Sequence, residues 1–258
     1  MSERRPKDVF LTVVVPAYGA EARIAATLET VAAYLDAKPF ASEIVVVDDG
    51  SPDRTAEAAR AVLAGRVVPS RVLARGFNLG KGASVREGVL AASGEIVLFT
   101  DDDLSTPIGE CDRLLAAIEA GADAAVGSRA LAASEILVRQ PRPREWMGKA
   151  FNLLVRLLVL RGYPDTQCGF KAFKRETARE VFSRLRAAGF AFDVEVLALC
   201  RDLGFRVAQV PVSWKDARPS RLRLFGGSWG MLRELLQIRR RARARRRGDG
   251  GGVAEEGP

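Results

Sequence analysis

The feature that most constrains the fold is an alternation of short apolar runs with longer segments of helical periodicity. The runs at residues 10–15, 43–47 and 95–99 are rich in β-branched residues and short enough to be buried parallel strands. Residues 21–35 between the first two carry apolar side chains at helical spacing. Strands that alternate with helices in this way predict an α/β protein with a doubly wound, mostly parallel sheet.

The rest of the chain continues this pattern with less regularity. Further strands are expected at residues 71–73, 122–126 and 205–214. Helices are expected at residues 55–63, 83–92, 146–160, 175–187 and 192–203, with a last helix from Trp229 onward. We find no internal repeat, so the body of the chain is expected to be a single domain.

The residues that are missing exclude several kinds of enzyme. The sequence contains no histidine, which excludes serine–histidine and cysteine–histidine hydrolases and nearly all zinc sites. Its three cysteines, Cys111, Cys168 and Cys200, are widely spaced and form neither a CxxC pair nor a disulfide framework. This cysteine usage favours a reducing, cytoplasmic location.

Charge is concentrated near the C-terminus and suggests the domain limits. The net charge is +8, and seven arginines lie within residues 239–247. We expect a flexible N-terminus at residues 1–9, a folded main domain at 10–228, a basic amphipathic helix at 229–247 and a disordered tail at 248–258. The apolar side of that helix would be formed by Leu232, Leu235, Leu236 and Ile238.

No segment has the features of a signal peptide or a membrane-spanning helix. The N-terminus leads directly into a strand-like run, and no window reaches the roughly 18 uninterrupted apolar residues of a spanning helix. The most apolar stretch, residues 146–160, is interrupted by Lys149, Asn152 and Arg156. It is expected to be either a core helix or a helix lying in a membrane interface, and the two interpretations carry equal weight.

Acidic and aromatic residues follow three of the expected strands. Ligands of open α/β sheets bind beyond the carboxyl ends of the strands. The first strand is followed by Pro16-Ala17-Tyr18 with Glu21 nearby, the second by Asp48-Asp49, and the strand at 95–99 by Asp101-Asp102-Asp103. Carboxylates at adjacent strand ends repel one another, so a positive or hydrogen-bond-donating group is expected between them.

The three consecutive aspartates suggest a metal site. If they continue the extended geometry of the strand, Asp101 and Asp103 lie on one face. One or two carboxylates together with substrate phosphate oxygens are a common way to bind Mg²⁺. In the alternative interpretation, one of these aspartates caps the next helix and the others are solvated.

Two common phosphate-binding motifs are absent. The segment that begins at Gly80 lacks the last glycine or alanine of the dinucleotide fingerprint. Gly76 and Lys81 are too close for a P-loop, and Gly82 stands where that motif requires Ser or Thr. Nicotinamide enzymes and P-loop NTPases are therefore not expected.

The order of these motifs resembles that of the inverting family-two glycosyltransferases of the GT-A fold. The matching segments are Pro16-Ala17-Tyr18, Asp48-Asp49-Gly50-Ser51, Asn78-Leu79-Gly80-Lys81 and Asp101-Asp102-Asp103. Later segments, among them Ser128-Arg129, residues 165–171, Phe192-Asp193-Val194-Glu195 and Ser220-Arg221-Leu222, resemble dolichyl- and polyprenyl-phosphate β-glucosyltransferases, which are similar to polyprenyl-phosphate mannose synthases. The resemblance covers residues 10 to 238.

The resemblance implies a three-layer sandwich around a mostly parallel sheet and a site for a nucleotide sugar. The donor site would be formed by Pro16, Ala17, Tyr18, Glu21, Asp48, Asp49, Asn78, Gly80, Lys81, Asp101, Asp102 and Asp103. Either Asp48 or Asp49 would contact the base. Asp101 and Asp103 would hold Mg²⁺ or Mn²⁺, although the family often has a small residue where this chain has Asp102.

The expected reaction is metal-dependent transfer of a hexose, with inversion, onto a polyprenyl or dolichyl phosphate. The metal would stabilise the leaving diphosphate as a Lewis acid. Arginine and lysine suit a phosphate acceptor, and Arg129, Lys171 and Arg221 are the candidates. An ionised phosphate hardly needs a base, whereas a hydroxyl acceptor does, and the resemblance then indicates Asp193 or Glu195.

Several alternatives remain open at this point. UDP-glucose is the favoured donor, but GDP-mannose as donor or a hydroxyl of a glycolipid or polysaccharide as acceptor fits the same motifs. A non-catalytic nucleotide-sugar-binding or nucleic-acid-binding protein is a lower alternative, since acidic strand ends repel nucleic acid. We expect a peripheral protein on the inner face of the plasma membrane, where arginines of the C-terminal helix contact anionic lipid.

Overall fold

The computed structural model describes residues 9–138, 142–216 and 227–248 of the chain. Its main feature is a seven-stranded sheet in the order β3-β2-β1-β4-β7-β5-β8. The strands of this sheet are β1 (Leu11–Ala17), β2 (Ser42–Asp48), β3 (Ser70–Ala74), β4 (Ile96–Thr100), β5 (Ala124–Ser128), β7 (Phe170–Lys174) and β8 (Val207–Pro211). A separate pair joins β6 (Glu135–Val138) to β9 (Ser213–Lys215).

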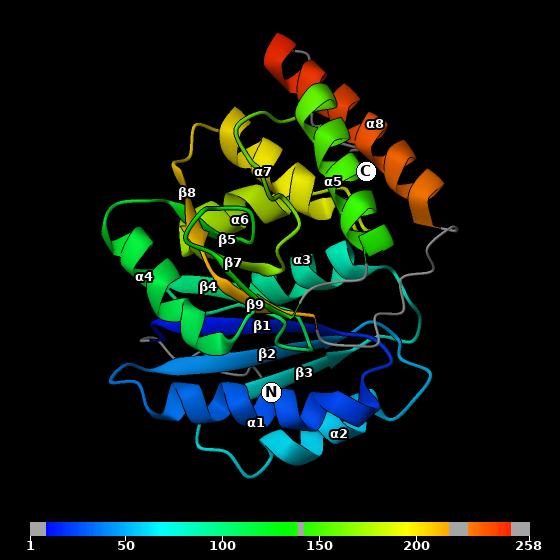
Figure 1. Ribbon diagram of the computed structural model, residues 1–258. Coiled ribbons are helices and arrows are strands. Elements are labelled where there is room, and N and C mark those ends of the chain that lie inside the picture. The colour runs from blue at the N-terminus through cyan, green and yellow to red at the C-terminus, as the bar shows by residue number, and fades with distance from the viewer. Residues whose placement is uncertain (1–8, 139–141, 217–226, 249–258) are drawn as a thin grey trace, which may run out of the picture.

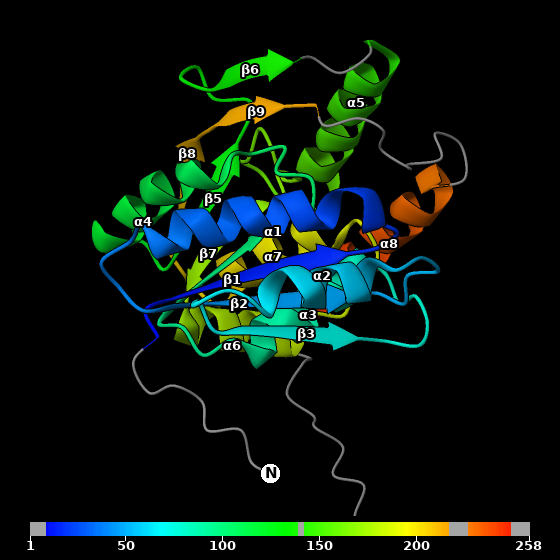
Figure 2. The ribbon, with the colours of Figure 1, turned by 90° about the horizontal axis from the view of Figure 1, so that it is seen from below.

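Helices cover both faces of the sheet, as Figures 1 and 2 show. They are α1 (Glu21–Asp36), α2 (Thr55–Leu63), α3 (Lys81–Ala91), the 3₁₀ turn η1 (Ile108–Glu110), α4 (Cys111–Glu119), α5 (Arg142–Leu158), α6 (Arg175–Arg184), α7 (Phe192–Asp202) and α8 (Gly227–Arg247). The expected three-layer α/β arrangement is confirmed. Most of the helices and strands expected from periodicity are found close to their expected limits. However, β6 was not predicted, no limits were predicted for α4, and the single strand expected at 205–214 is divided into β8 and β9.

One strand in the middle of the sheet differs from the expected pattern. β7 pairs antiparallel with both β4 and β5, and all the other neighbouring strands of this sheet run parallel. The sequence analysis did not predict β7. Since β7 follows residues 165–169, it brings that segment beside the end of β4.

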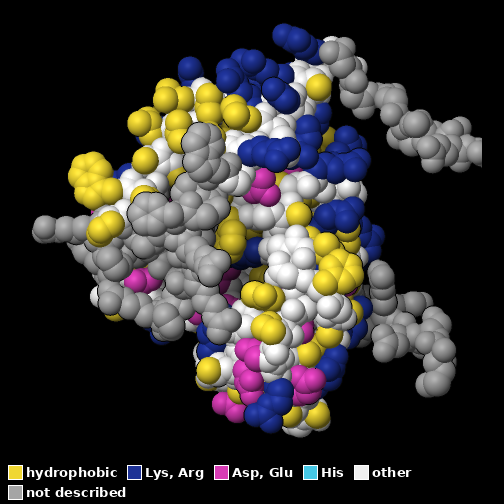
Figure 3. Space-filling view, turned by 90° about the vertical axis from the view of Figure 1, so that its right-hand side faces the viewer, with side chains coloured by type: hydrophobic (Ala, Val, Ile, Leu, Met, Phe, Trp, Pro, Cys, Tyr) yellow, Lys and Arg dark blue, Asp and Glu magenta, His cyan; other side chains and the backbone are white. Residues whose placement is uncertain are grey.

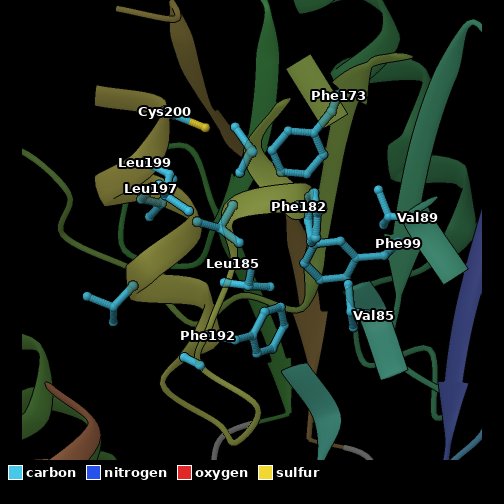
Figure 4. Packing of buried hydrophobic residues seen from close by; sticks show 14 of the residues in the cluster. Val85, Val89, Phe99, Phe173, Phe182, Leu185, Phe192, Leu197, Leu199 and Cys200 are labelled. Atoms are coloured by element: carbon cyan, nitrogen blue, oxygen red, sulfur yellow. The ribbon is translucent and has the colours of Figure 1, made fainter. Parts of the chain in front are cut away.

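The period of two along the strands divides the core between the two faces. In β1, Val14 packs with one hydrophobic cluster, while Val13 and Val15 pack with the other. Side chains from α3, α6 and α7 complete the first cluster and side chains from α1, α2 and α4 complete the second. Phe99, Phe173 and Phe182 meet at the centre of the first cluster, where the ring of Phe182 stands edge-on to both others (Figure 4).

The structure corrects the expected orientation of the C-terminal helix. Leu235 and Ile238 of α8 are fully buried and belong to the core, so they do not form an apolar side that faces a membrane. Arg245 pairs with Asp202 at 3.1 Å, which ties part of the basic tract to α7. Leu236 remains exposed.

Helix α5 combines features of both interpretations proposed for residues 146–160. Val155 is fully buried in the core. On another side of the helix, large apolar residues are exposed, namely Trp146, Met147, Leu153, Leu154 and Leu157. Among the described residues, no helix combines the length and hydropathy needed to cross a membrane.

Candidate functional site

The acidic strand ends converge at one edge of the sheet. Ala17 at the end of β1 pairs in register with Asp48 at the end of β2, and β4 runs parallel to β1 on its other side. The three strand ends and the start of α3 therefore lie at the same edge, as Figure 1 shows. The structure thus brings together the three acidic and aromatic motifs found in the sequence.

Asp48 and Asp49 are both buried and have different partners. The carboxylate of Asp48 accepts hydrogen bonds from the hydroxyl and backbone N–H of Ser51. Asp49 accepts from the backbone N–H of Leu79 at 3.0 Å and of Gly80 at 2.8 Å, and it pairs with Arg75 at 2.8 Å. Asp49 therefore fixes the loop that leads into α3.

Around this loop, the expected donor-site residues differ in exposure. Pro16 and Ala17 are buried within β1, whereas Tyr18 is 44% exposed and Asn78 is exposed. Glu21 accepts a hydrogen bond from Arg54 Nε at 2.9 Å. Tyr18 and Asn78 are therefore the members of this group most open to a ligand.

The geometry of the three aspartates differs from the extended strand that was assumed. β4 ends at Thr100, and the next residues form a turn in which the N–H of Leu104 donates to the carbonyl of Asp101 at 3.3 Å. Leu104 has φ of 46°, a left-handed conformation that costs a non-glycine residue about 1 kcal/mol or more. The extended-strand argument for Asp101 and Asp103 is therefore wrong, although both still lie at the sheet edge.

Asp102 faces helix α1. Its carboxylate pairs with Arg23 at 2.6 Å, and its backbone carbonyl accepts from the Thr27 hydroxyl at 2.7 Å. Burial, with repulsion from Asp101 and Asp103, outweighs Arg23 and raises the pKa of Asp102 to about 6. These contacts favour a structural role for Asp102 over direct contact with a ligand.

Asp101 lies between α3 and the segment that precedes β7. Its Oδ1 is 2.5 Å from the ammonium of Lys81. Burial alone would lower the pKa of Lys81, but Asp101 and Asp193 outweigh it and raise that pKa. Gly169 lies so close that an added Cβ would be 2.3 Å from the Asp101 carboxylate.

Lys171 and Asp193 form an ion pair that is almost completely buried. Their charged atoms are 2.5 Å apart, and the two side chains are 1% and 4% exposed. The ammonium of Lys171 also donates to the carbonyl of Cys168 at 2.6 Å. Burial raises the pKa of Asp193, although Lys171 and Lys81 act against this rise.

Glu195 is fully buried and has structural partners. Its Oε2 accepts from the backbone N–H groups of Arg186 at 3.1 Å and Ala187 at 2.6 Å. Its Oε1 is 3.1 Å from Arg241 of α8. These contacts favour Asp193 over Glu195 as the candidate base.

Arg129 is held in place by Asp165. Nε and one terminal nitrogen of the guanidinium donate to the two carboxylate oxygens at 2.7 and 2.8 Å, a bidentate geometry. The Arg129 side chain is 27% exposed and that of Asp165 is 3% exposed. Of the three expected acceptor-binding cations, Arg129 is the more open of the two described, and Arg221 lies outside the described residues.

Asp165→Asn should lower the free energy of unfolding by about 2–3 kcal/mol, because it removes charged hydrogen bonds to Arg129. Burial would raise the pKa of Asp165, but Arg129 lowers it below the ordinary value of 3.8. A carboxyl group with a lowered folded-state pKa stabilises the protein above its unfolded-state pKa. The difference between wild type and variant should therefore be largest near pH 7 and shrink as the pH falls below about 4. Urea unfolding at pH 7 and pH 4 measures it, and equal stability at pH 7 would contradict this prediction.

Some site residues were not predicted from the sequence. Arg75, which holds Asp49, and Arg23, which holds Asp102, lie in segments without a recognisable motif. The close approach of Gly169 to Asp101 depends on the antiparallel strand β7. For this region, the sequence analysis had only the resemblance of residues 165–171 to the family.

The donor set at the sheet edge fits a divalent cation that also binds substrate. No group of three His, Cys, Asp or Glu side chains that could hold a metal occurs within residues 9–138, 142–216 and 227–248. Asp101 and Asp103 nevertheless lie in the same turn after β4, and burial together with repulsion from Asp101 raises the pKa of Asp103. Asp101 Oδ1 is buried, and its charged neighbour is the ammonium of Lys81. If two carboxylates bind a Mg²⁺ ion, most of its coordination positions remain for water and substrate phosphate oxygens.

The family is shown by comparison with known sequences. Residues 12–182 match the description Glycosyl transferase family 2. The chain belongs to this family.

Similar proteins extend the match over nearly the whole chain. A dolichyl-phosphate β-glucosyltransferase of Trichomonas vaginalis is 37% identical over 244 residues, which are 90% of this chain and 72% of that protein. The enzyme of the same name from Dictyostelium discoideum is 34% identical over 93% of this chain and 77% of its own length. The human one is 33% identical over 90% of this chain and 75% of its own length.

Solved structures confirm the GT-A-like fold of this family member. Glucosyl-3-phosphoglycerate synthase from Mycobacterium tuberculosis, in complex with Mn²⁺, UDP-glucose and phosphoglyceric acid, has a TM-score of 0.68 at 23% identity. The match covers 90% of this chain and 80% of that one. The same enzyme with Mg²⁺ and UDP has a TM-score of 0.67 at 23% identity, with 91% and 79% covered.

Proposed function

We propose that the protein transfers glucose from UDP-glucose, with inversion, to the phosphate of a dolichol-type polyprenyl lipid. The observation that carries the proposal is the arrangement at the sheet edge, where Asp101 and Lys81 lie beside the Lys171–Asp193 pair. Arg129 adds a cation held in a geometry suited to phosphate. Relatives named dolichyl-phosphate β-glucosyltransferase support the same substrates.

The donor would bind along the ends of β1 and β2 and the start of α3. Tyr18 is exposed at the end of β1 and can pack on a base. The fixed loop before α3 places Asn78, Gly80 and Lys81 together, where backbone N–H groups and an ammonium can contact ribose or phosphate. Asp48 or Asp49 would accept from the base only by exchanging one of its present partners.

Asp101 and Asp103 would hold Mg²⁺ or Mn²⁺ together with the donor diphosphate. When bound, such an ion supplies a positive charge that stabilises the leaving UDP. Lys81 would contribute a second positive charge near the same phosphates, because its ammonium lies 2.5 Å from Asp101. Structures of the mycobacterial neighbour that contain UDP with Mn²⁺ or Mg²⁺ support a divalent ion.

The cations of the site favour a phosphate acceptor over a hydroxyl. Arg129 is partly exposed and orientated by Asp165, so it can bind the lipid phosphate directly. Lys171 could reach that phosphate only by leaving Asp193, since its side chain is 1% exposed. A phosphate acceptor is already ionised at neutral pH and needs no base, whereas a hydroxyl acceptor would need Asp193.

A transfer assay tests the proposal against its alternatives. Purified protein would be mixed with dolichyl or undecaprenyl phosphate in detergent and with labelled UDP-glucose or GDP-mannose, in Mg²⁺ or EDTA. We expect Mg²⁺-dependent, acid-labile lipid label from UDP-glucose. Label from GDP-mannose would overturn the assignment of UDP-glucose as the donor. Metal-dependent UDP release without labelled lipid would indicate a hydroxyl acceptor, and no release would favour a binding protein.

Gly169→Ala should fold normally and lose about 100-fold in kcat. The added Cβ would displace the Asp101 carboxylate, which can rotate away at little cost to stability. A misplacement of about 1 Å in a reacting assembly can cost about 100-fold in rate. Gly109→Ala is the matched control, since nothing lies within 4 Å of its Cβ position. Equal turnover rates for the two variants would argue against a role for Asp101.

A membrane surface is the partner that α5 fits. Its exposed apolar residues lie on one side of the helix, and Lys149 and Arg156 are exposed beside them. Figure 3 views the molecule from the right-hand side of Figure 1. In its upper part, hydrophobic side chains gather next to Lys and Arg. We propose that this apolar face, with the exposed Arg240, Arg243 and Arg247 of α8, contacts an anionic bilayer.

Leu153→Glu/Leu157→Glu should weaken binding to vesicles of phosphatidylglycerol and phosphatidylcholine by at least about tenfold. The change removes two exposed apolar side chains, each worth about 1.5–3 kcal/mol when fully buried, and adds negative charge. Val67→Glu is the control, because Val67 is 92% exposed and lies between α2 and β3. Co-sedimentation measures the binding, and an equal loss in both variants would rule out a specific role for α5.

A further inference from the structure

Helix α8 binds the backbone of residues 186–191, a segment that lies beside the candidate site. The carboxylate of Glu234 accepts from the N–H of Gly189 at 3.1 Å and of Ala191 at 3.3 Å. Glu195 of α7 accepts from the N–H groups of Arg186 and Ala187. Two carboxylates thus hold four backbone groups of this short segment.

Helix α8 also provides the positive charge that accompanies Glu195. Arg241 lies 3.1 Å from Glu195 Oε1, and the Glu195 side chain is fully buried. Leu235 and Ile238 on the same helix are buried in the core that includes α7. The position of α8 is therefore fixed relative to α7, and Glu234 is fixed with it.

The same segment contacts the start of α3. The carbonyl of Ala188 accepts from the N–H of Ala83 at 3.2 Å. An added Cβ at Gly80 would lie 2.5 Å from the Ala188 oxygen, and one at Gly82 would lie 2.4 Å from the Ala187 oxygen. Lys81 lies between these two glycines, so a shift of the segment moves the backbone that carries it.

The other end of the segment leads into the helix that carries Asp193. Ala191, whose N–H is held by Glu234, is the residue immediately before α7. Asp193 lies in the first turn of α7 and pairs with Lys171. One short segment therefore links Glu234 to both charged groups that flank Asp101.

We infer that Glu234 is a positioning residue for the transfer reaction, acting through residues 186–191 on Lys81 and Asp193. The inference rests on the proposed function, because one part of its test measures the turnover of that reaction. A reacting assembly depends on side chains held by their supporting contacts within about 0.5 Å. Glu234 contacts the backbone N–H groups of Gly189 and Ala191, and its effect is transmitted through this backbone.

The test compares Glu234→Ala with Gln237→Ala, an exposed position on the same helix. We expect Glu234→Ala to lower kcat/KM for UDP-glucose about tenfold or more without changing KM for the lipid phosphate. Glu234→Gln keeps one acceptor oxygen and should recover part of the loss. Hydrogen exchange of the full-length protein should rise at residues 186–191 and also at the Ala83 amide. Gln237→Ala should change none of these.

Three outcomes would overturn the inference. The first is unchanged kcat/KM in Glu234→Ala, and the second is a loss that only follows the unfolded fraction in thermal melts. The third is faster exchange at 186–191 with no change at Ala83. The exchange measurement needs no turnover. If the wild type fails to transfer glucose while the Ala83 amide still responds, the proposed function fails and the structural coupling stands.

Discussion

Asp101→Asn should lower kcat by at least about 1000-fold while the protein stays folded. Asparagine has the shape of aspartate but lacks the charge that would hold a divalent cation and pair with Lys81. Loss of several kcal/mol of charge stabilisation in the transition state corresponds to about three orders of magnitude in rate. The Asp101 side chain is 31% exposed, so its ion pair contributes about 1 kcal/mol or less to stability. Initial rates with labelled UDP-glucose across a Mg²⁺ series, together with thermal melts, measure both effects.

The matched control for this variant is Asp112→Asn. Asp112 lies on α4, is 57% exposed and pairs with Lys38, which follows the end of α1, away from the strand ends. It undergoes the same chemical change and should keep wild-type turnover. If Asp101→Asn also kept turnover within a few-fold of wild type, the assignment of Asp101 as a metal ligand would be wrong. A loss that high Mg²⁺ partly restores would support it.

The parts of the site that the sequence predicts well are local to single strands. A buried β-branched run followed directly by carboxylates places those carboxylates at a strand end, whatever the rest of the chain does. Asp48, Asp49 and Asp101 are therefore found at one edge as expected. The turn at Leu104 was not predictable, because a left-handed leucine leaves no mark in a polar sequence around it.

The parts that the sequence misses depend on contacts between distant elements. Phe170–Lys174 was not predicted as a strand, and as β7 it enters the sheet between β4 and β5. Lys171 was proposed as a cation open to the acceptor, but β7 places it against Asp193 of α7. Likewise, the apolar periodicity of α8 is the same whether Leu235 faces a membrane or the core. The position of β7, the partner of Lys171 and the burial of Leu235 are all set by tertiary packing, which leaves only a weak signal in the local sequence.

Asp193→Asn should lower the free energy of unfolding by about 3–5 kcal/mol, the cost of leaving one member of a buried ion pair without its partner. Lys171 is 1% exposed, and its ammonium would keep the Cys168 carbonyl and the face of the Phe99 ring, neither of which carries a negative charge. For a domain of this size the loss corresponds to a fall of roughly 10 °C in the melting temperature. Thermal and urea unfolding measure it, and a change below about 1 kcal/mol would contradict the prediction.

The double variant Lys171→Met/Asp193→Leu separates stability from reaction. Apolar replacement of a whole buried ion pair is often neutral or stabilising, so most of the lost stability should return. If the pair serves the reaction, kcat/KM for the lipid phosphate should remain at least about 100-fold below wild type. Glu43→Gln is the control, since Glu43 is also buried and pairs with Arg71, but at the opposite end of β2 from Asp48. It should lose stability and keep turnover below its melting temperature. Full activity in the double variant would mean that the Lys171–Asp193 pair only fills the core. Binding of the acceptor phosphate would then depend on Arg129 and not on Lys171.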